Sequence, residues 1–275
     1  MPTYVAPAAL VAAPARTALP FGLGSVLGWR TGDRFESGVT WTSLPCQPAL
    51  GRAGESCQTD AADDIPGLPK DIENAGGPVP GYADSFIVMG MYRCLSVGTS
   101  VTEAQQWAEL ALMQGEEARA EQALWFGDLG NVPNFSGANG FPAPVTAGTH
   151  DTAVAALAAA EDAAAREYLT QPVLHMSRRT VTLLGRSVER QGTRLFSRNL
   201  GTPIVAGTGY PDTPDIVATP ALFGYRSEVF NPSGRAGDLF DTQYNWMNAV
   251  AERSYLVGFD PCDVIKASYT GEVTP

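Results

Sequence analysis

Residues 43–82 are rich in glycine, proline, aspartate and alanine, a composition that predicts turns and irregular structure. A compact domain rarely carries so long an irregular stretch unless the stretch has a function of its own. Residues 1–28 impose a similar constraint, because their prolines disfavour helix while their apolar side chains need another surface to cover them. We therefore expect a folded body with two extensions, a long loop and an N-terminal arm, and we expect the arm to dock on a neighbour.

The strongest helix signal follows directly after an apolar, β-like run at residues 85–97. Thr102 and Gln105 have the spacing of a capping box, which predicts that the helix begins there. Apolar residues then recur at helical spacing to about Phe126. A glycine and an aspartate at residues 127–128 are expected to end this helix.

A second, alanine-rich helix is expected from about His150 to Leu169, with Asp151 or Thr149 as its cap. The other predicted elements are strands over residues 29–42, 173–176, 200–206 and 216–224, a short helix over 180–186, and a terminal strand pair formed by 254–259 and 262–269. The chain also contains 29 glycines and 21 prolines, which favour many turns. The expected fold class is therefore α+β rather than a helical bundle.

The charge balance argues against a surface built to hold nucleic acid phosphates, because the formal net charge is −11. Only two lysines occur, Lys70 and Lys266, so nearly all basic residues are arginine. No stretch resembles a targeting signal, and no apolar run approaches the length needed to span a bilayer. We expect a soluble protein that is made in the cytoplasm.

The cysteines and histidines do not have the spacing of a metal site. Zinc sites need close pairs of ligands, and the four cysteines contain no CxxC pair. In a reducing cytoplasm the default expectation is free, mostly buried thiols, and a Cys46–Cys57 bridge is the one pairing worth checking. The residues considered are Cys46, Cys57, Cys94, Cys262, His150 and His175.

Motifs for nucleotide binding or nucleophilic catalysis are weak or absent from the sequence. Gly22, Gly24 and Gly28 miss the spacing of a dinucleotide-binding fingerprint, and neither a P-loop nor a G-x-S-x-G elbow occurs. His150 lies at the expected start of a helix, where a capping role is favoured. His175 lies between Leu174 and Met176, which favours a buried histidine with satisfied hydrogen bonds over a general base.

The acidic and aromatic groupings also favour structural roles over catalysis or ligand binding. Glu117 and Glu121 share a helix face, where like charges usually mark a solvated surface or an interface rather than a glycosidase pair. Trp107 and Trp125 also share a face, which favours core or interface packing over carbohydrate binding. Four loop aspartates lack the spacing of a calcium-binding EF-hand, so a solvated loop is favoured; they are Asp60, Asp63, Asp64 and Asp71.

The order of these signals resembles the major capsid proteins of tailed phages, which have the Hong Kong 97-type fold. In that family an arm leads into an extended loop, and then into a long spine helix that ends in a carboxylate-rich turn and a glycine-rich loop. Three stretches carry the resemblance: GEEARAEQALWFGDLGN at residues 115–131, LGTPIVAGTGYP at residues 200–211, and the closing segment at residues 243–269, which holds Glu252, Arg253 and Pro261.

The resemblance implies an α+β fold with four parts. Residues 1–28 correspond to the N-terminal arm, residues 29–84 to the extended loop, residues 150–225 to a central axial domain, and residues 85–149 with 226–275 to a peripheral domain that contains the spine helix. It also implies a non-enzymatic role with no catalytic residues, cofactor or metal.

The function implied is that of a structural subunit that self-assembles into an icosahedral shell around a phage genome. Its partners would be copies of itself in pentamers and hexamers, with scaffold, portal and decoration proteins as further candidates. The shell would enclose double-stranded DNA without reading its sequence, would contact no membrane, and would be assembled in the host cytoplasm to become part of the virion. Two alternatives remain open: another virion or tail component, and the shell protein of an encapsulin compartment, which shares the fold.

Overall fold

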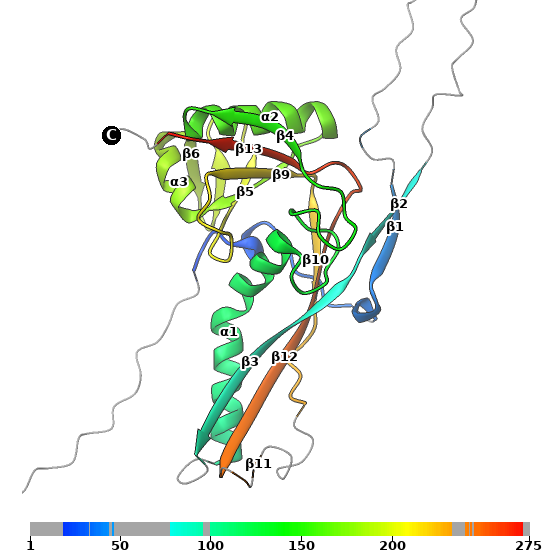
Figure 1. Cartoon of the computed structure of the whole chain (residues 1–275), viewed down its shortest axis with the longest axis vertical. Helices are drawn as coiled ribbons and strands as arrows, with labels where there is room; N and C mark the ends of the chain where they lie inside the picture. The colour runs from blue at the N-terminus through cyan, green and yellow to red at the C-terminus, as the bar shows by residue number, and fades with distance from the viewer. Residues whose placement is uncertain are drawn as a thin grey trace, which may run out of the picture.

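The computed structural model describes residues 19–32, 34–43, 46, 78–95, 100–232, 240–241, 243 and 245–271. Most of the arm and of the long loop lie outside these residues, as do the four loop aspartates, Cys57 and Lys70. The described chain is α+β, with one long helix packed on an elongated sheet and a second helix packed on a seven-stranded sheet (Figure 1).

The long helix α1 spans Val101–Phe126. Its capping box is formed by Ser100 and Glu103 rather than by Thr102 and Gln105, so the predicted cap was wrong by two residues. The Glu103 N–H donates to Ser100 Oγ at 3.2 Å, and the Ser100 N–H donates to the Glu103 carboxylate at 2.8 Å. At the other end Gly127 has a left-handed backbone with φ of 68°, as the predicted stop requires.

The elongated sheet under α1 is built on a long antiparallel pair (Figure 1). Strand β3 (Ser85–Leu95) pairs with β12 (Trp246–Phe259) over its full length, and the short strands β10 (Leu222–Arg226) and β11 (Phe240–Asp241) also pair with β12. The alternation of side chains along a strand gives this sheet one buried face, against α1, and one outward face.

Small residues let α1 approach this sheet closely. A Cβ atom on Gly90 of β3 would collide with the α1 backbone at Ala108 and Leu112. Two alanines of β12, Ala249 and Ala251, lie on the same buried face and are almost fully enclosed. The helix and the sheet therefore interlock through backbone proximity, which only glycine and alanine permit at these positions.

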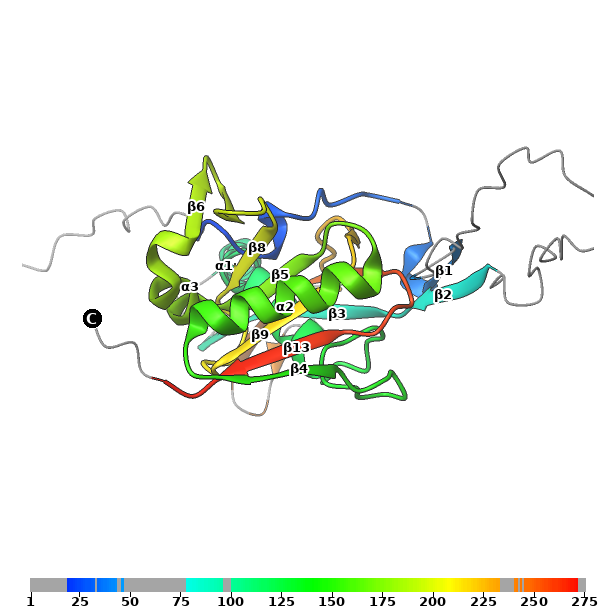
Figure 2. The same cartoon turned by 90° about the horizontal axis from the view of Figure 1, so that it is seen from above.

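The seven-stranded sheet forms the second layer of the molecule, and the helix α2 (Ala153–Tyr168) lies across one of its faces (Figure 2). Its central strand β5 is buried at every residue. In spatial order the strands are β4 (Val145–His150), β13 (Ile265–Tyr269), β9 (Asp215–Thr219), β5 (Val173–Ser177), β8 (Pro203–Gly207), β7 (Arg194–Ser197) and β6 (Val188–Gln191). The helix α3 (Arg178–Leu184) and the 3₁₀ turn η3 (Gly185–Ser187) follow β5.

The helix α2 begins later than the sequence indicates, because the residues before it belong to a strand. Thr152 is the N-cap and accepts a hydrogen bond from the Ala155 N–H at 3.2 Å, so neither Asp151 nor Thr149 caps the helix. His150 ends β4, which pairs in parallel with β13. The predicted capping role for His150 was therefore wrong.

The predicted terminal strand pair was also wrong. β12 belongs to the elongated sheet and β13 to the seven-stranded sheet, and the turn between them carries the chain from one layer to the other. Residues 254–259 and 265–269 are each in a strand, as expected. Their partners lie far away in the sequence, so their pairing could not be read from local pattern.

A two-stranded ribbon leads into the long loop, formed by β1 (Val39–Ser43) and β2 (Val79–Ala83). The strand expected over residues 29–42 is mostly not formed, and Phe35 lies in the 3₁₀ turn η2 (Phe35–Ser37). Phe35, Val39 and Trp41 nevertheless pack in one cluster, together with Ala83 and Leu256. A further 3₁₀ turn, η1 (Leu23–Ser25), lies at the base of the arm.

The close approach of α1 to β3 predicts a large penalty for a single methyl group. We expect Gly90→Ala to lower the free energy of unfolding by about 1–3 kcal/mol, because the helix must move away from the strand. The matched control is Gly115→Ala inside α1, where no atom lies within 4 Å of the added Cβ. That control should be neutral or stabilising by up to about 1 kcal/mol. Urea denaturation of the purified chain measures both, and equal stability of G90A and wild type would contradict the packing described.

Candidate assembly surfaces and the arm junction

Two carboxylates of α1 hold the base of the arm and a loop of the seven-stranded sheet. The Glu121 side chain accepts the Leu23 N–H at 2.9 Å through one oxygen and the Gly209 N–H at 2.9 Å through the other. Glu117, one turn earlier, accepts the Gly24 N–H at 2.8 Å. We call this group of contacts the arm junction: the backbone of residues 22–24, Glu117, Glu121 and Gly209.

The glycines of the arm junction are there because the backbone must come close to α1. A Cβ atom on Gly22 would lie 2.6 Å from a Glu117 oxygen, and one on Gly209 would collide with the Ala118 carbonyl group. The glycines that weakly suggest a nucleotide site thus bring backbone N–H groups to carboxylates of the chain's own helix. Gly28, by contrast, has no atom within 4 Å of an added Cβ and takes no part.

Burial makes Glu121 an unusual carboxylate. Its side chain is only 1% exposed, and this burial raises its pKa to about 7, although the N–H groups of Gly209 and Leu23 oppose the rise. The nearby charge of Glu117 raises the pKa further. The expectation that Glu117 and Glu121 mark a solvated surface or an interface was therefore wrong, since both bind backbone groups of their own chain.

The third glutamate of this group, Glu116, binds a different element. The Arg253 side chain of β12 donates to both Glu116 oxygens at 2.8 and 2.9 Å, and each side chain is 13% exposed. Burial, followed by the charge of Glu116, raises the pKa of the adjoining Tyr255. Three nearby glutamates therefore connect α1 to the sheet, to the arm base and to the seven-stranded layer.

His175 is a structural residue, as predicted. It is fully buried on β5, with Nδ1 2.8 Å from the Tyr210 hydroxyl and Nε2 3.0 Å from the Thr219 hydroxyl. Burial lowers its pKa to about 3, so the imidazole is neutral across the physiological range. A neutral ring with both nitrogens bonded and no contact with solvent is unsuited to general base catalysis.

The outward face of the elongated sheet carries a row of exposed apolar side chains. Ile87, Met89 and Met91 alternate along β3 and are 50%, 53% and 64% exposed. Phe230 is 62% exposed and forms an isolated β-bridge with Glu252 of β12, and Glu252 pairs with Met89 of β3. Directly paired residues point to the same side of a sheet, so Phe230, Glu252 and Met89 share one face. We call Ile87, Met89, Met91 and Phe230 the apolar strip.

A second apolar surface runs along the first half of α1. Trp107, Leu110 and Met113 are 47%, 37% and 56% exposed, and the Trp107 ring also stacks on Tyr92 of β3 with its centroid 6.1 Å away. Trp125, on the same helix face as Trp107, is instead buried against Phe135 and Tyr210. The sequence predicted core or interface packing for both tryptophans. Trp125 is a core residue, whereas Trp107 is half-exposed.

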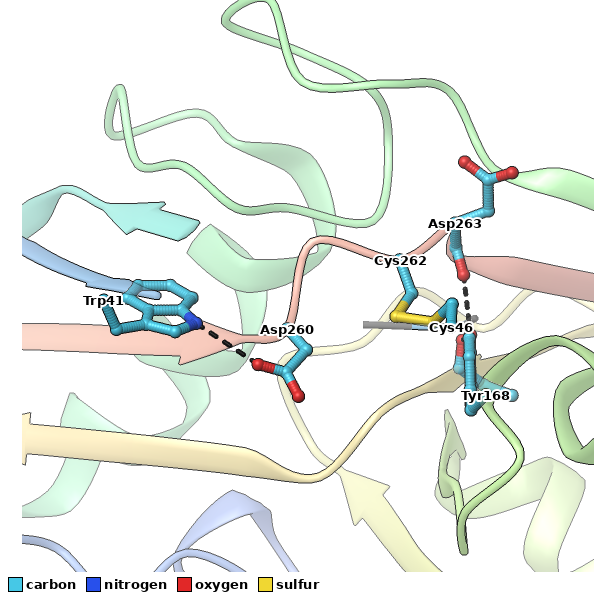
Figure 3. The surroundings of a disulfide bond; sticks show 7 residues. Trp41, Cys46, Tyr168, Asp260, Cys262 and Asp263 are labelled. Atoms are coloured by element: carbon cyan, nitrogen blue, oxygen red, sulfur yellow. Dashed lines mark hydrogen bonds between the residues drawn. A yellow bond between two sulfur atoms is a disulfide. The ribbon is translucent and has the colours of Figure 1, made fainter. Parts of the chain in front are cut away.

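The sulfur chemistry differs from expectation. Cys46 and Cys262 form a disulfide, with their Cα atoms 6.0 Å apart and a sequence separation of 216 (Figure 3). Cys94 is a free thiol in β3. The expected free thiols are therefore wrong for Cys46 and Cys262, and Cys46 has a different partner from Cys57. No local pattern signals this pairing, because the two segments meet only in the folded chain.

Neither a metal-binding cluster nor a membrane-spanning helix is present among the described residues. No group of three or more His, Cys, Asp or Glu side chains within them is arranged to hold a metal ion. No helix in the described part of the chain is long and apolar enough to cross a membrane.

The fold has close counterparts among solved structures, whereas no family model and no curated protein matches the sequence. The capsid of a native GTA particle matches with a TM-score of 0.57 and 13% identity, over 97% of this chain and 96% of that chain. The holo-SrpI encapsulin complex from Synechococcus elongatus matches with a TM-score of 0.56 and 12% identity, over 98% and 94%. A chain of Mycobacterium phage Bobi matches with a TM-score of 0.54 and 13% identity, over 96% of each chain. The chain thus has the Hong Kong 97-type fold that its order of elements indicated.

The arm junction predicts a pH-dependent contribution to stability. Because the folded pKa of Glu121 lies near 7, above its ordinary value of 4.5, its contribution is fully present below about pH 4.5 and is lost as the pH rises through 7. The free energy of unfolding of wild type should therefore fall relative to that of Glu121→Gln as the pH rises, by roughly 2–3 kcal/mol between pH 5 and pH 8.

The difference in stability between the two proteins is measured, rather than the stability of wild type alone, because His175 gives stability the opposite pH dependence. Its folded pKa of about 3 lies below the ordinary 6.5, so its contribution is lost as the pH falls. Comparing two proteins that both contain His175 cancels that effect. Glu189→Gln in the exposed strand β6 is the matched control and should give a constant difference. A constant difference for E121Q as well would contradict a buried, titrating Glu121.

Proposed function

We propose that this chain is the structural subunit of an icosahedral shell, the major capsid protein of a tailed phage or of a phage-like particle. The observation that carries the proposal is the fold it shares, along nearly its whole length, with chains from particles described as capsids. At 13–15% identity this likeness establishes the fold, and the function is the inference drawn from it. The proposed role is structural rather than enzymatic.

In this proposal the two layers correspond to the two domains of a shell subunit. The elongated sheet with α1 is the peripheral domain, with α1 as the spine helix. The seven-stranded sheet with α2 is the axial domain, and the β1–β2 ribbon is the base of the extended loop. We assign β4 and β13 to the axial domain because both pair inside its sheet, and β10 to the peripheral domain because it pairs with β12. The axial domain proposed from sequence at residues 150–225 therefore gains β4 and β13 and loses β10.

The exposed apolar surfaces support an assembling protein. The apolar strip and the α1 surface at Trp107, Leu110 and Met113 offer side chains that would lose contact with water against a neighbour. In a closed shell each subunit is surrounded by copies, so surfaces that are exposed in the single chain become interfaces. The apolar composition of residues 1–28 fits the same requirement.

The proposed partners are copies of the chain arranged as pentamers and hexamers, with scaffold, portal and decoration proteins as further candidates. The net charge of −11 suits a wall that encloses double-stranded DNA without binding it tightly or reading its sequence. The shell would be assembled in the host cytoplasm and released as part of a virion.

An encapsulin-type compartment is the second candidate, because a structure of that kind matches with a TM-score of 0.56. The disulfide favours the virion. Disulfides persist in oxidising surroundings and on virion surfaces, and they are rare in proteins that remain in a reducing cytoplasm. Another virion or tail component is the third reading, and its expected product would be a ring or tube rather than a closed shell.

Negative-stain electron microscopy of the purified chain tests the proposal. Uniform hollow shells, or pentameric and hexameric rings, are the expected result. A monodisperse monomer, or a tube of stacked rings, would contradict self-assembly into a shell. Adding a co-expressed scaffold would then decide whether assembly requires a second protein.

The apolar strip gives a residue-level prediction. Met89→Glu combined with Met91→Glu should reduce the yield of assembled particles at least tenfold, because charges would have to be buried at the interface. The double variant Met89→Leu, Met91→Leu keeps the strip apolar and should assemble like wild type. Size-exclusion chromatography with light scattering measures the yield, and circular dichroism checks that the charged variant is folded. Normal assembly of the folded charged variant would remove the strip from the interface.

A further inference from the structure

The disulfide joins the base of the long loop to the turn that connects the two layers of the molecule (Figure 3). Cys46 lies just after β1, at the start of the loop. Cys262 lies between β12 and β13, is 8% exposed, and belongs to the core cluster under α2. The bond therefore ties an extension to the interior of the subunit.

Noncovalent contacts already bring the two segments together. The Trp41 indole N–H of β1 donates to Asp260 at 3.2 Å, two residues before Cys262 (Figure 3). The Trp41 ring also meets Phe223 edge to face, with centroids 4.8 Å apart. A Cα separation of 6.0 Å lies within the range that a disulfide spans without backbone movement. The Trp41 contacts join the two segments independently of the bond.

The Cys262 side of the bond is firmly anchored. The Tyr168 hydroxyl at the end of α2 donates to the carbonyl oxygens of Asp263 and Ala218, at 2.8 Å each. The turn is therefore attached both to α2 and to β9. Closing the disulfide fixes the start of the loop to this anchored turn, whereas opening it leaves the ribbon attached by noncovalent packing alone, in which Val39, Trp41 and Ala83 take part.

We propose that Cys46–Cys262 is a redox staple, open while subunits assemble in a reducing cytoplasm and closed once the particle meets an oxidising medium. The inference rests on the proposed function, since it assigns the two redox states to two stages in the life of a shell. The open state leaves the base of the extended loop free to adjust during assembly. The closed state locks it and strengthens the finished particle.

The closing reaction is a thiol–disulfide exchange with a small-molecule disulfide such as oxidised glutathione. The Cys46 thiolate, the less buried of the two, attacks the oxidant and releases one thiol, giving a mixed disulfide. The Cys262 thiolate then attacks the Cys46 sulfur and releases the second thiol. In total the two cysteines give up two electrons and two protons, and one oxidant disulfide becomes two thiols.

Peptide mapping by mass spectrometry under nonreducing conditions tests the bond directly. A Cys57→Ser background removes the third cysteine near the loop and so prevents exchange with it. Particles treated with oxidised glutathione should yield a cross-linked peptide that contains Cys46 and Cys262, and particles kept in reductant should yield the separate peptides. A persistent pair of free thiols at these positions after oxidation would overturn the proposal.

Thermal unfolding tests the consequence. The bond closes a loop of 216 residues, so reduction of native particles with dithiothreitol should lower the unfolding temperature by roughly 5–15 °C. Cys46→Ser should unfold at the lower temperature with or without reductant. Cys94→Ser is the control, because Cys94 is a free thiol, and it should retain the full response. An unchanged unfolding temperature on reduction would overturn the staple even if Cys46→Ser fails to fold.

The two proposals fail separately. If the chain forms shells that lack the cross-link and ignore reductant, the staple is wrong and the shell function stands. If no shells form in either redox state, the shell function fails, while the peptide map of the isolated subunit still reports whether the two cysteines pair.

Discussion

One buried carboxylate holds three parts of this molecule together. Glu121 of α1 uses one oxygen for the base of the arm and the other for the loop that follows β8. Around it, Glu117 binds the arm a second time and Glu116 pairs with Arg253 of β12. Because α1 also packs against β3 through Gly90, the helix is the element that fixes the arm, the elongated sheet and the seven-stranded sheet to one another.

The segments at the described edges of the arm and of the long loop are both fixed to the body. The carboxylates of α1 bind the backbone of residues 23–24, and Trp41 and the Cys46–Cys262 disulfide hold the end of the ribbon. The surfaces that the body leaves uncovered, the apolar strip and the first half of α1, are the ones that a shell-forming protein would present to its neighbours.

Local pattern predicted α1 to within one residue, the buried strand β5 and the structural role of His175, because each is determined by periodicity, glycine stops or apolar neighbours. It misjudged Glu117 and Glu121, because the N–H groups that bind them come from residues 22–24 and 209. It missed the disulfide and the separation of β12 from β13 for the same reason, since both depend on contacts between distant segments. The order of weak signals along the chain indicated the fold better than any one motif.

Cryo-electron microscopy of the assembled particle tests the central claim most directly. The account predicts a closed icosahedral shell of pentamers and hexamers, with α1 and the elongated sheet at the periphery of each capsomer, the seven-stranded sheet around its axis, and the apolar strip covered by a neighbouring copy. A helical tube or a closed ring, or a shell in which the apolar strip faces solvent, would contradict it.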